Sequence, residues 1–373
     1  MEKELNNLLS KPLSFYFNKF PIFDFKKNKE VILFGAARMG AIGIDLFQKN
    51  KIKVLAVCDN DSSKTDTKME EVPVINIKTL LTFPKATPIV ITSICNDEIY
   101  KQLNKLGFKN VWSLTYFASF YSNKFYNPSW DNPIDILLSS KKELVEVFKL
   151  YEDNESRKTF LGILKHRLFL DINYINKIKR DLSKEYFDDE VIKLSKEEVF
   201  IDGGAFDGDT IKSFIKKTKN KFEKIYSFEP DNTSFNSLNQ YVKSLKDKRI
   251  SIAKKGLGRA KSVVSFFNEG SFGSRISNLG TEKIRIVKLD DELLNKKITL
   301  IKLDIEGAEI DALNGAKNLI KRNRPKLAIC VYHKPRDLWE IPLLIKKILP
   351  EYKLNLRHYG ELPYETICYA QIS

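Results

Sequence analysis

The chain lacks the features that would place it in a membrane or in an oxidising compartment. None of its 373 residues belongs to an apolar run of eighteen or more, so no membrane-spanning segment is predicted. The opening residues MEKELNNLLSKPLSFYF contain early acidic residues and no small-residue cleavage site, which argues against a secretory signal. Only four cysteines occur, none in a CxxC pair, so we expect reduced thiols rather than a disulfide or a zinc site. They are Cys58, Cys95, Cys330 and Cys368. These absences together predict a cytoplasmic protein.

Motifs for nucleic-acid binding are also missing, although the chain is basic. Its 63 lysine and arginine residues against 48 aspartate and glutamate residues give a net charge of +15. Neither a helix-turn-helix, a zinc finger nor an RNA-binding aromatic motif accompanies this charge, so no nucleic-acid partner is predicted. Because the lysines are spread along the chain, we interpret the charge as solvated faces. An anionic partner, such as a phosphorylated sugar carrier or a membrane surface, is the alternative.

The length favours two α/β domains, and the first spans residues 1–125. A strand at 30–34, a small-residue turn and a second strand at 53–58 form a Rossmann-like βαβ unit. Gly35, Arg38, Gly40 and Asp59 stand where a dinucleotide site places its glycines, a phosphate contact and an acid. Two readings stay open. The domain binds NAD(P) or a nucleotide sugar, or it binds nothing and serves for docking or dimerisation.

Residues 126–190 are predicted to be a helical connector. The loop residues 127–133 mark its start, and helices are expected from Lys141 and from about Asp153. Residues 186–189 end the connector and are placed above the site as part of a lid. We expect residues 1–28 to pack onto the first domain.

The stretch at 198–210, EVFIDGGAFDGDT, organises the second domain, residues 191–373. A strand ends at Asp202, a glycine-rich turn follows, and a helix begins near Asp209 and Thr210. Such a unit brings a ligand close to bare backbone. After the next strand, Glu229 and Pro230 supply a carboxylate that accepts both hydroxyls of a ribose.

Two later strands end in further polar residues. The strand at 299–303 precedes Asp304 and Glu306, and the strand at 326–332 precedes His333. Because ligands bind at the carboxyl ends of the strands of an open α/β sheet, we expect these side chains to meet Asp202 and Glu229 at one edge.

The second domain resembles the FkbM family of S-adenosylmethionine-dependent methyltransferases. The matching phrases are FIDGGAFDGDT, SFEPD, VKLDDEL and IKLDIEGAEIDALNGA, followed by RPKLAIC. The resemblance implies a seven-stranded class I methyltransferase sheet behind a Rossmann-like domain, and methyl transfer to a hydroxyl of a sugar, glycan precursor or related polar metabolite. It also implies the residues that hold the cofactor. These are Asp202, Gly203, Gly204, Ala205, Phe206, Gly208, Asp209, Thr210, Glu229, Pro230 and Asp304.

The resemblance places Asp304 and Glu306 beside the transferred methyl group. His333 is the first choice for the general base because an imidazole near neutrality accepts a proton, and Asp304 is the second. A Mg²⁺ ion at Asp304 and Glu306 is possible because two carboxylates suit this ion, but it is weakly supported because no further ligand spacing accompanies them, and no residue is assigned as a metal ligand.

Two other functions remain open at this point: an NAD(P)-dependent oxidoreductase built on the first domain, and a non-catalytic module that binds nucleotide sugars. The expected partner is a small-molecule or glycan substrate, with or without a nucleotide or lipid carrier. The sequence leaves the oligomeric state open, a homo-oligomer included.

Overall fold

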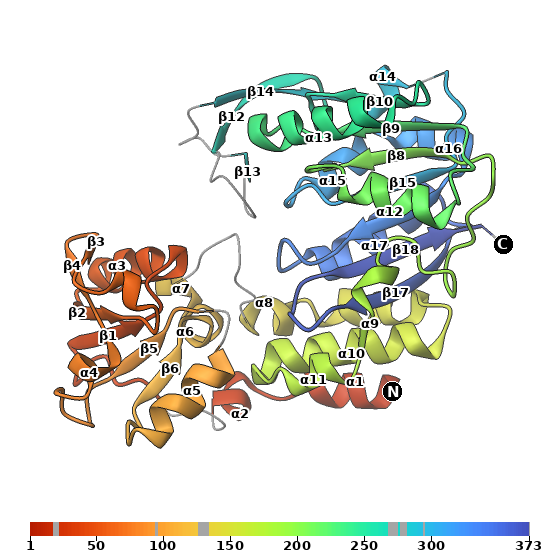
Figure 1. Cartoon of the computed structure of the whole chain (residues 1–373). Helices are drawn as coiled ribbons and strands as arrows, with labels where there is room; N and C mark the ends of the chain where they lie inside the picture. The colour runs from red at the N-terminus through yellow and green to blue at the C-terminus, as the bar shows by residue number, and fades with distance from the viewer. Residues whose placement is uncertain are drawn as a thin grey trace. The chain divides into compact units, whose positions relative to one another are not determined.

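The computed structural model describes residues 1–17, 22–93, 96–125, 134–267, 275–276, 282–293 and 295–372. It contains two compact units, shown in Figure 1. The small unit comprises residues 11–139 and 168–170, and the large unit comprises residues 1–10, 140–167 and 171–373. Cys95 and the predicted boundary loop at 127–133 lie outside the described residues. Both units are α/β, as predicted.

The small unit is a six-stranded sheet in the order β3-β4-β2-β1-β5-β6, parallel except for β3 at its edge. Its strands are β1 (Glu30–Phe34), β2 (Lys53–Cys58), β3 (Lys68–Met69), β4 (Val72–Ile75), β5 (Ile89–Ile91) and β6 (Val111–Ser113). Its helices are α2 (Leu13–Phe17), α3 (Arg38–Lys49), α4 (Ile77–Leu80), α5 (Asn96–Lys105), α6 (Leu114–Phe120), α7 (Ser122–Phe125) and α8 (Ile134–Ser139), with a 3-10 turn η1 (Ser62–Lys64). The central strands are buried on both faces and read as apolar runs, as parallel strands do.

The large unit is built on an eight-stranded sheet in the order β10-β9-β8-β15-β16-β18-β17-β7. Seven of these strands match the predicted sheet, and the two-residue β7 adds an eighth beside β17. They are β7 (Lys179–Arg180), β8 (Val199–Gly203), β9 (Lys224–Phe228), β10 (Ile250–Ala253), β15 (Leu300–Leu303), β16 (Lys326–Cys330), β17 (Lys353–Tyr359) and β18 (Thr366–Gln371). The terminal pair β17–β18 is antiparallel, as predicted. A second, four-stranded sheet has the order β11-β14-β12-β13 and contains β11 (Gly256–Leu257), β12 (Ser262–Phe267), β13 (Arg275–Ile276) and β14 (Glu282–Val287).

Helices cover both faces of the large sheet (Figure 1). The chain runs outward from β8 to β10 and then returns to β15 and β16, so right-handed crossovers place the two sets of helices on opposite faces. The helices of this unit are α1 (Glu2–Leu9), α9 (Lys141–Leu150), α10 (Asn154–Phe169), α11 (Asn173–Asn176), α12 (Asp209–Lys217), α13 (Asn232–Leu245), α14 (Leu289–Glu292), α15 (Glu309–Asn314), α16 (Lys317–Asn323) and α17 (Asp337–Ile348), with a 3-10 turn η2 (Leu182–Lys184). Under α12 and α13, Phe200, Phe214 and Ile225 belong to one continuous apolar core.

The structure divides the chain differently from the predicted boundaries. The helices of the predicted connector belong to the large unit, where Asp153 at the start of α10 pairs with the buried Arg357 of β17 at 2.8 Å. Helix α1 also lies in the large unit, and Glu2 and Glu4 pair with Lys149 and Lys165. The prediction that residues 1–28 pack onto the first domain is therefore wrong for residues 1–10.

The aromatic segment that follows behaves as predicted. Phe23 contacts Trp112 and Phe117 in the small unit, with ring centroids 5.1 and 4.9 Å apart. Both partners lie on or next to α6, so this segment closes the core of the small unit.

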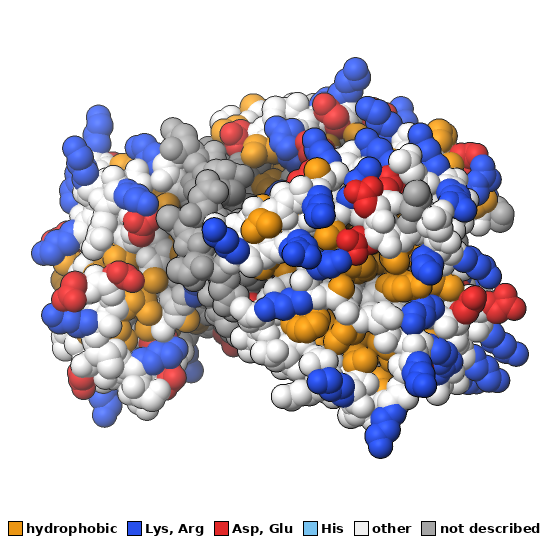
Figure 2. All heavy atoms as spheres, turned by 90° about the horizontal axis from the view of Figure 1, so that it is seen from above, with side chains coloured by type: hydrophobic (Ala, Val, Ile, Leu, Met, Phe, Trp, Pro, Cys, Tyr) orange, Lys and Arg blue, Asp and Glu red, His pale blue; other side chains and the backbone are white. Residues whose placement is uncertain are grey.

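Lysine and arginine side chains are spread over the face shown in Figure 2 rather than gathered in one patch. This distribution agrees with the interpretation of the net charge as solvated faces. Among the described residues, no helix is both long enough and apolar enough to cross a membrane.

Candidate functional site

The turn between β8 and α12 is shaped by three residues with a positive φ. Gly204, Phe206 and Gly208 have φ values of +75°, +46° and +99°. A Cβ added to Gly204 would lie 1.7 Å from the carbonyl oxygen of Asp304, so no other residue fits there without moving β15. The turn therefore meets the end of β15 backbone to backbone.

Glu229, at the end of β9, ties this turn to the neighbouring strand. Its Oε2 accepts the N–H of Phe206 and its Oε1 accepts the N–H of Asp231, both at 2.9 Å. Pro230 lies between the strand end and Asp231. Burial raises the pKa of Glu229 to about 7, against the two backbone hydrogen bonds, which lower it. Each carboxylate oxygen can accept a second hydrogen bond, so the group retains capacity for two ligand hydroxyls.

Asp202 is buried inside the sheet opposite Lys302 of β15. Lys302 Nζ lies 3.3 Å from Asp202 Oδ1 and donates to the carbonyl oxygen of Gly204 at 2.7 Å. Burial raises the pKa of Asp202 to about 6, although the Lys302 charge lowers it. Through these two contacts, Lys302 links Asp202 to the start of the glycine-rich turn. Whether Asp202 also contacts a cofactor stays a prediction.

The first turn of α12 contains the other predicted residues of this stretch. The side chain of Asp209 accepts the N–H of Thr210 at 2.6 Å, and Thr210 is buried. Ala205 is buried beneath the turn, whereas Phe206 is 39 % exposed at its tip. The structure thus brings Gly203, Gly204, Ala205, Phe206, Gly208, Asp209 and Thr210 together with Glu229.

Asp304 follows β15 and receives three partners. Tyr186 Oη donates to its Oδ2 at 2.7 Å, and Tyr332 Oη donates to its Oδ1 at 3.3 Å. His333 Nε2 lies 3.2 Å from the same Oδ1. Burial alone would raise the pKa of Asp304, but the contacts with His333 and Lys302 bring it well below the usual value. Asp304 is therefore an ionised, strongly bound carboxylate.

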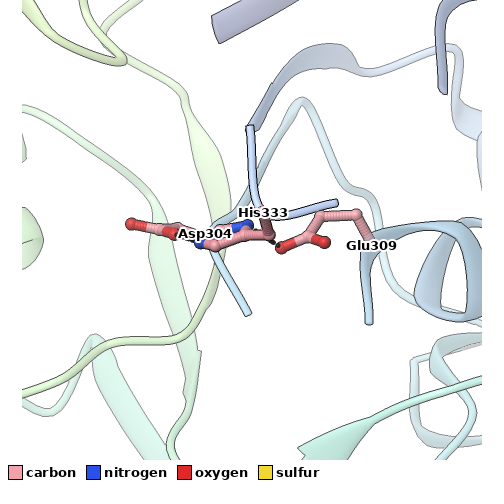
Figure 3. Close-up of side chains that lie close together, drawn as sticks. All are labelled: Asp304, Glu309 and His333. Atoms are coloured by element: carbon pink, nitrogen blue, oxygen red, sulfur yellow. Dashed lines mark ion pairs between the residues drawn. The ribbon is translucent and has the colours of Figure 1, made fainter. Parts of the chain in front are cut away.

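His333 lies between carboxylates on both sides of its ring, as Figure 3 shows for Asp304 and Glu309. Its Nδ1 is 3.0 Å from Glu309 Oε1, and its Nε2 is 3.7 Å from Glu306 Oε2. Burial lowers the pKa of His333, but Glu309 and Asp304 outweigh it and raise the pKa well above the usual value. The carboxylates on both sides therefore favour the charged form of the predicted base.

Glu306 sits in a strained turn before α15. Its φ is +55° and that of Gly307 is +92°, and the turn is held because Glu309 Oε1 accepts the N–H of Ile305 at 2.8 Å. The Glu306 side chain is 45 % exposed, compared with 25 % for Asp304 and 8 % for His333. Burial raises the pKa of Glu306 despite the nearby His333 charge. A non-glycine residue with positive φ is uncommon and points to a local constraint.

One ligand atom from each of Asp304, Glu309 and His333 lies within 4.8 Å of the others. This group does not include Glu306, which was considered for Mg²⁺ together with Asp304. Each ring nitrogen of His333 already faces a different carboxylate, and the ring itself fills the space between them (Figure 3). A single ion cannot take both carboxylates and one nitrogen without turning that ring, so the arrangement suits a protonated imidazole better than a metal.

Several residues of this edge were missed by sequence reasoning. Glu309 lies within the LDIEGAE phrase and is fully buried in the first turn of α15. An acid in the first turn of a helix was the only feature of the sequence that could have identified it. Glu185 and Glu365 come from segments far apart in the chain, and Tyr332 Oη donates to Glu365 Oε2 at 3.3 Å. Burial and the neighbouring Glu365 raise the pKa of Glu185 to about 10. In the segment predicted to be a lid, Tyr186 contacts the site, because its hydroxyl donates to Asp304.

The small unit repeats the turn architecture around Gly35. Ala36 N–H donates to Asp59 Oδ2 at 2.6 Å, and Gly35 N–H donates to the Cys58 carbonyl at 2.8 Å. A Cβ on Gly40 would lie 2.4 Å from the Gly35 carbonyl oxygen. Arg38 begins α3 after this turn, so the four predicted residues do lie at one edge of the sheet, at the ends of β1 and β2. Asp59 differs from Glu229 because Lys64 Nζ lies 3.3 Å from its carboxylate.

Comparisons with known proteins agree with this geometry. Residues 202–359 match the family model of the methyltransferase FkbM domain, and residues 27–111 match that of the C2185-like N-terminal domain. No curated protein matches the chain significantly.

Among solved structures, a methyltransferase FkbM from Methylobacillus flagellatus KT is similar with a TM-score of 0.82 at 21 % identity, covering 99 % of this chain and 100 % of that one. A SAM-dependent methyltransferase from Aquifex aeolicus gives a TM-score of 0.31 at 17 % identity, over 54 % of this chain and 99 % of that one. Fibrillarin from Aeropyrum pernix with bound S-adenosyl-L-methionine gives 0.30 at 11 %, over 48 % and 70 %. The first likeness shows that the fold extends over both units, and the other two carry no argument.

Proposed function

We propose, from the premise that this chain carries an FkbM methyltransferase domain, that it moves a methyl group from S-adenosylmethionine to a hydroxyl of a sugar, glycan precursor or related polar metabolite. The predicted resemblance to the FkbM methyltransferases is confirmed by the family model and by the fold. The family match does not specify O-methyl transfer or the class of acceptor, and these two parts are our proposal. The observation that supports them best is the cluster of hydrogen-bonding groups around Asp304, at the same sheet edge as the glycine-rich turn bonded to Glu229.

The residues present fit the cofactor. Gly204 and Gly208 are required because the Asp304 carbonyl oxygen and the Tyr241 ring occupy the space that their Cβ atoms would need, so the turn presents backbone without side chains at these two positions. Glu229 offers acceptor oxygens for ribose hydroxyls, and the positive end of α12 lies next to the turn. When bound, S-adenosylmethionine supplies a methyl group on a positively charged sulfur. The carboxylates at this edge favour that charge.

The hydroxyl acceptor is supported by the hydrogen-bonding groups around Asp304. Tyr332 Oη bridges Asp304 and Glu365, and Tyr186 Oη contacts Asp304 from the other side. Carboxylates and phenol groups of this kind orient the hydroxyls of a polar substrate. A nucleotide- or lipid-linked acceptor and a homo-oligomeric state stay proposals.

Of the three predicted catalytic side chains, Glu306 fits the role of proton acceptor best. Asp304 is already bound by three donors, and His333 faces a carboxylate at each nitrogen. Glu306 is the most exposed of the three and has a raised pKa, as a general base near neutral pH requires. In this role the Glu306 carboxylate would take the proton that the acceptor hydroxyl loses when its oxygen receives the methyl group, while the sulfonium sulfur of the cofactor would keep the electron pair of the broken carbon–sulfur bond and leave as a neutral thioether.

Calorimetry with S-adenosylmethionine tests the cofactor assignment on the full chain. We expect Glu229→Ala to weaken binding at least tenfold, because the ribose hydroxyls lose their acceptor. The matched control is Asp59→Ala in the small unit, which should change the affinity less than twofold. Absence of binding to the unmodified protein at millimolar cofactor would contradict the proposal.

Transfer of a labelled methyl group into a low-molecular-weight cell extract tests the proton acceptor. We expect Glu306→Gln to lower the transfer rate about 100-fold while cofactor affinity stays within threefold. Equal rates for the variant and the unmodified protein would exclude Glu306 from this role.

The oxidoreductase and the non-catalytic module are not favoured. The family match of residues 202–359 is to a methyltransferase domain, and the carboxylate of Asp59 is already paired with Lys64.

A further inference from the structure

We propose that Glu309 is a positioning residue that fixes the His333 ring, so that Nε2–H permanently faces the Asp304 carboxylate, with Glu306 as the next carboxylate. The inference rests on the proposed methyl transfer, because it explains how the carboxylates at the methyl-transfer edge are held in place. It also replaces the predicted role of His333 as a general base.

The position of Glu309 is set from several directions. The residue is fully buried in the first turn of α15, and its Oε1 accepts the N–H of Ile305 at 2.8 Å and of Gly307 at 3.4 Å. The same oxygen lies 3.0 Å from His333 Nδ1. One carboxylate oxygen therefore holds both the strained turn that carries Glu306 and the ring that faces it.

The surroundings of Nε2, the second nitrogen of the His333 ring, favour a proton on that atom. While Nδ1 lies 3.0 Å from Glu309 Oε1, Nε2 faces Asp304 at 3.2 Å and Glu306 at 3.7 Å. An unprotonated Nε2 would set its lone pair against two carboxylates, which is unfavourable in a buried setting. A proton on Nε2 instead neutralises part of the cluster and donates to Asp304.

The charge around the ring comes from every element packed against it. Asp304 and Glu306 follow β15, Glu309 begins α15, Asp337 begins α17, and Glu365 precedes β18. Three cations lie beside these groups: Lys302 of β15, which contributes to Asp304, Lys334, whose Nζ donates to the Gly307 carbonyl, and the buried Arg167, which interacts with Asp337. The carboxylates outnumber the cations, so a protonated ring is favoured on balance.

Histidine NMR on the full chain tests the proposal directly, because only three histidines are present. We expect the His333 imidazole to stay doubly protonated through pH 8. His358 serves as an internal reference, since burial lowers its pKa to about 4 and its ring is neutral at the same pH. His166→Gln assigns the third signal.

The variant Glu309→Gln keeps the size of the side chain and an acceptor oxygen but removes the charge. It should lower the His333 titration midpoint by at least one pH unit, a tenfold change in proton affinity. Glu197→Gln, a change of an exposed acid, is the matched control and should leave it unchanged. A purely structural role for Glu309 would not move this midpoint in a folded variant.

Two results would overturn the proposal: a His333 midpoint near 6.5 in the unmodified protein, or the same midpoint in Glu309→Gln. Loss of the His333 proton on adding 1 mM ZnCl₂ or MnCl₂ would also overturn it, because the ring would then be a metal ligand. Calorimetry with S-adenosylmethionine on the same samples separates these failures from a failure of the proposed function.

Discussion

The two glycine-rich turns of this chain have the same backbone plan and different electrostatics. In each unit an acid at the end of the second strand accepts an N–H from the turn, Asp59 from Ala36 and Glu229 from Phe206. In the small unit a half-exposed lysine, Lys64, then pairs with the acid. In the large unit the lysine, Lys302, is buried beneath the turn and pairs with Asp202 rather than with Glu229, whose pKa its charge also lowers. The shared backbone arrangement therefore maintains the fold of both turns. The position of one lysine determines whether the acid is paired with a cation, as Asp59 is with Lys64, or is not, as in Glu229.

Removing the two lysines should give the largest contrast. Lys302→Met leaves Asp202 as an unpaired buried charge and should lower the unfolding free energy by roughly 3–5 kcal/mol. Lys64→Met removes a 39 %-exposed partner and should cost less than about 1 kcal/mol. Urea denaturation measures both.

The double variant Asp202→Asn/Lys302→Met sharpens this comparison. If the cost of Lys302→Met comes from the orphaned carboxylate, the double variant should recover a large part of it. No recovery would mean that the hydrogen bond from Lys302 to the Gly204 carbonyl carries the effect.

Alanine at the turn glycines should give the next largest contrast. Gly204→Ala brings a Cβ to 1.7 Å from the Asp304 carbonyl oxygen and should cost about 3 kcal/mol or more. At Gly35 the nearest atom is 2.9 Å away, so a smaller loss is expected. Gly107→Ala has a similar φ of +91° but open space, and it isolates the backbone term at about 1 kcal/mol. Thermal unfolding of the three variants should follow this order, and an equal loss at Gly204 and Gly107 would contradict the steric argument.

The pH dependence of stability should also separate the two acids, Glu229 and Asp59. The folded pKa of Glu229 is raised from 4.5 to about 7, so its contribution to stability is complete below pH 4.5 and is lost as the pH rises to 7. The stability of the unmodified protein relative to Glu229→Gln should fall by about 3 kcal/mol across that window. The pKa of Asp59 is lowered below 3.8, although burial opposes this shift. Its contribution should be present above pH 3.8 and be lost only on further acidification.

Cofactor affinity gives a second readout of the same difference. Because ribose hydroxyls donate to the ionised form of Glu229, binding of S-adenosylmethionine should strengthen between pH 6 and 8. The Glu229→Gln variant should show a flat profile over this range. A rise of the same size in the variant would assign the pH dependence to another group.

Local sequence patterns predicted the parts of the site that depend on neighbours along the chain. The turn at 203–208, Glu229 after β9 and Asp304 after β15 were found because a strand, its end and the following turn are contiguous. Their convergence was predictable because the carboxyl ends of parallel strands meet at one edge. The cofactor contacts of these residues stay predictions.

The sequence by itself therefore determined the α/β class, the order of strands and helices, and the edge at which the glycine-rich stretch lies. Only the tertiary structure decided the partners of its charges. The register of β8 against β15 places Lys302 opposite Asp202, and a side-chain contact across strands cannot be read from either strand alone. In the same way, the fold brings Glu309 of α15 within 3.0 Å of His333, which follows β16. Burial then sets the pKa values, because desolvation depends on what covers a group and not on its position in the chain.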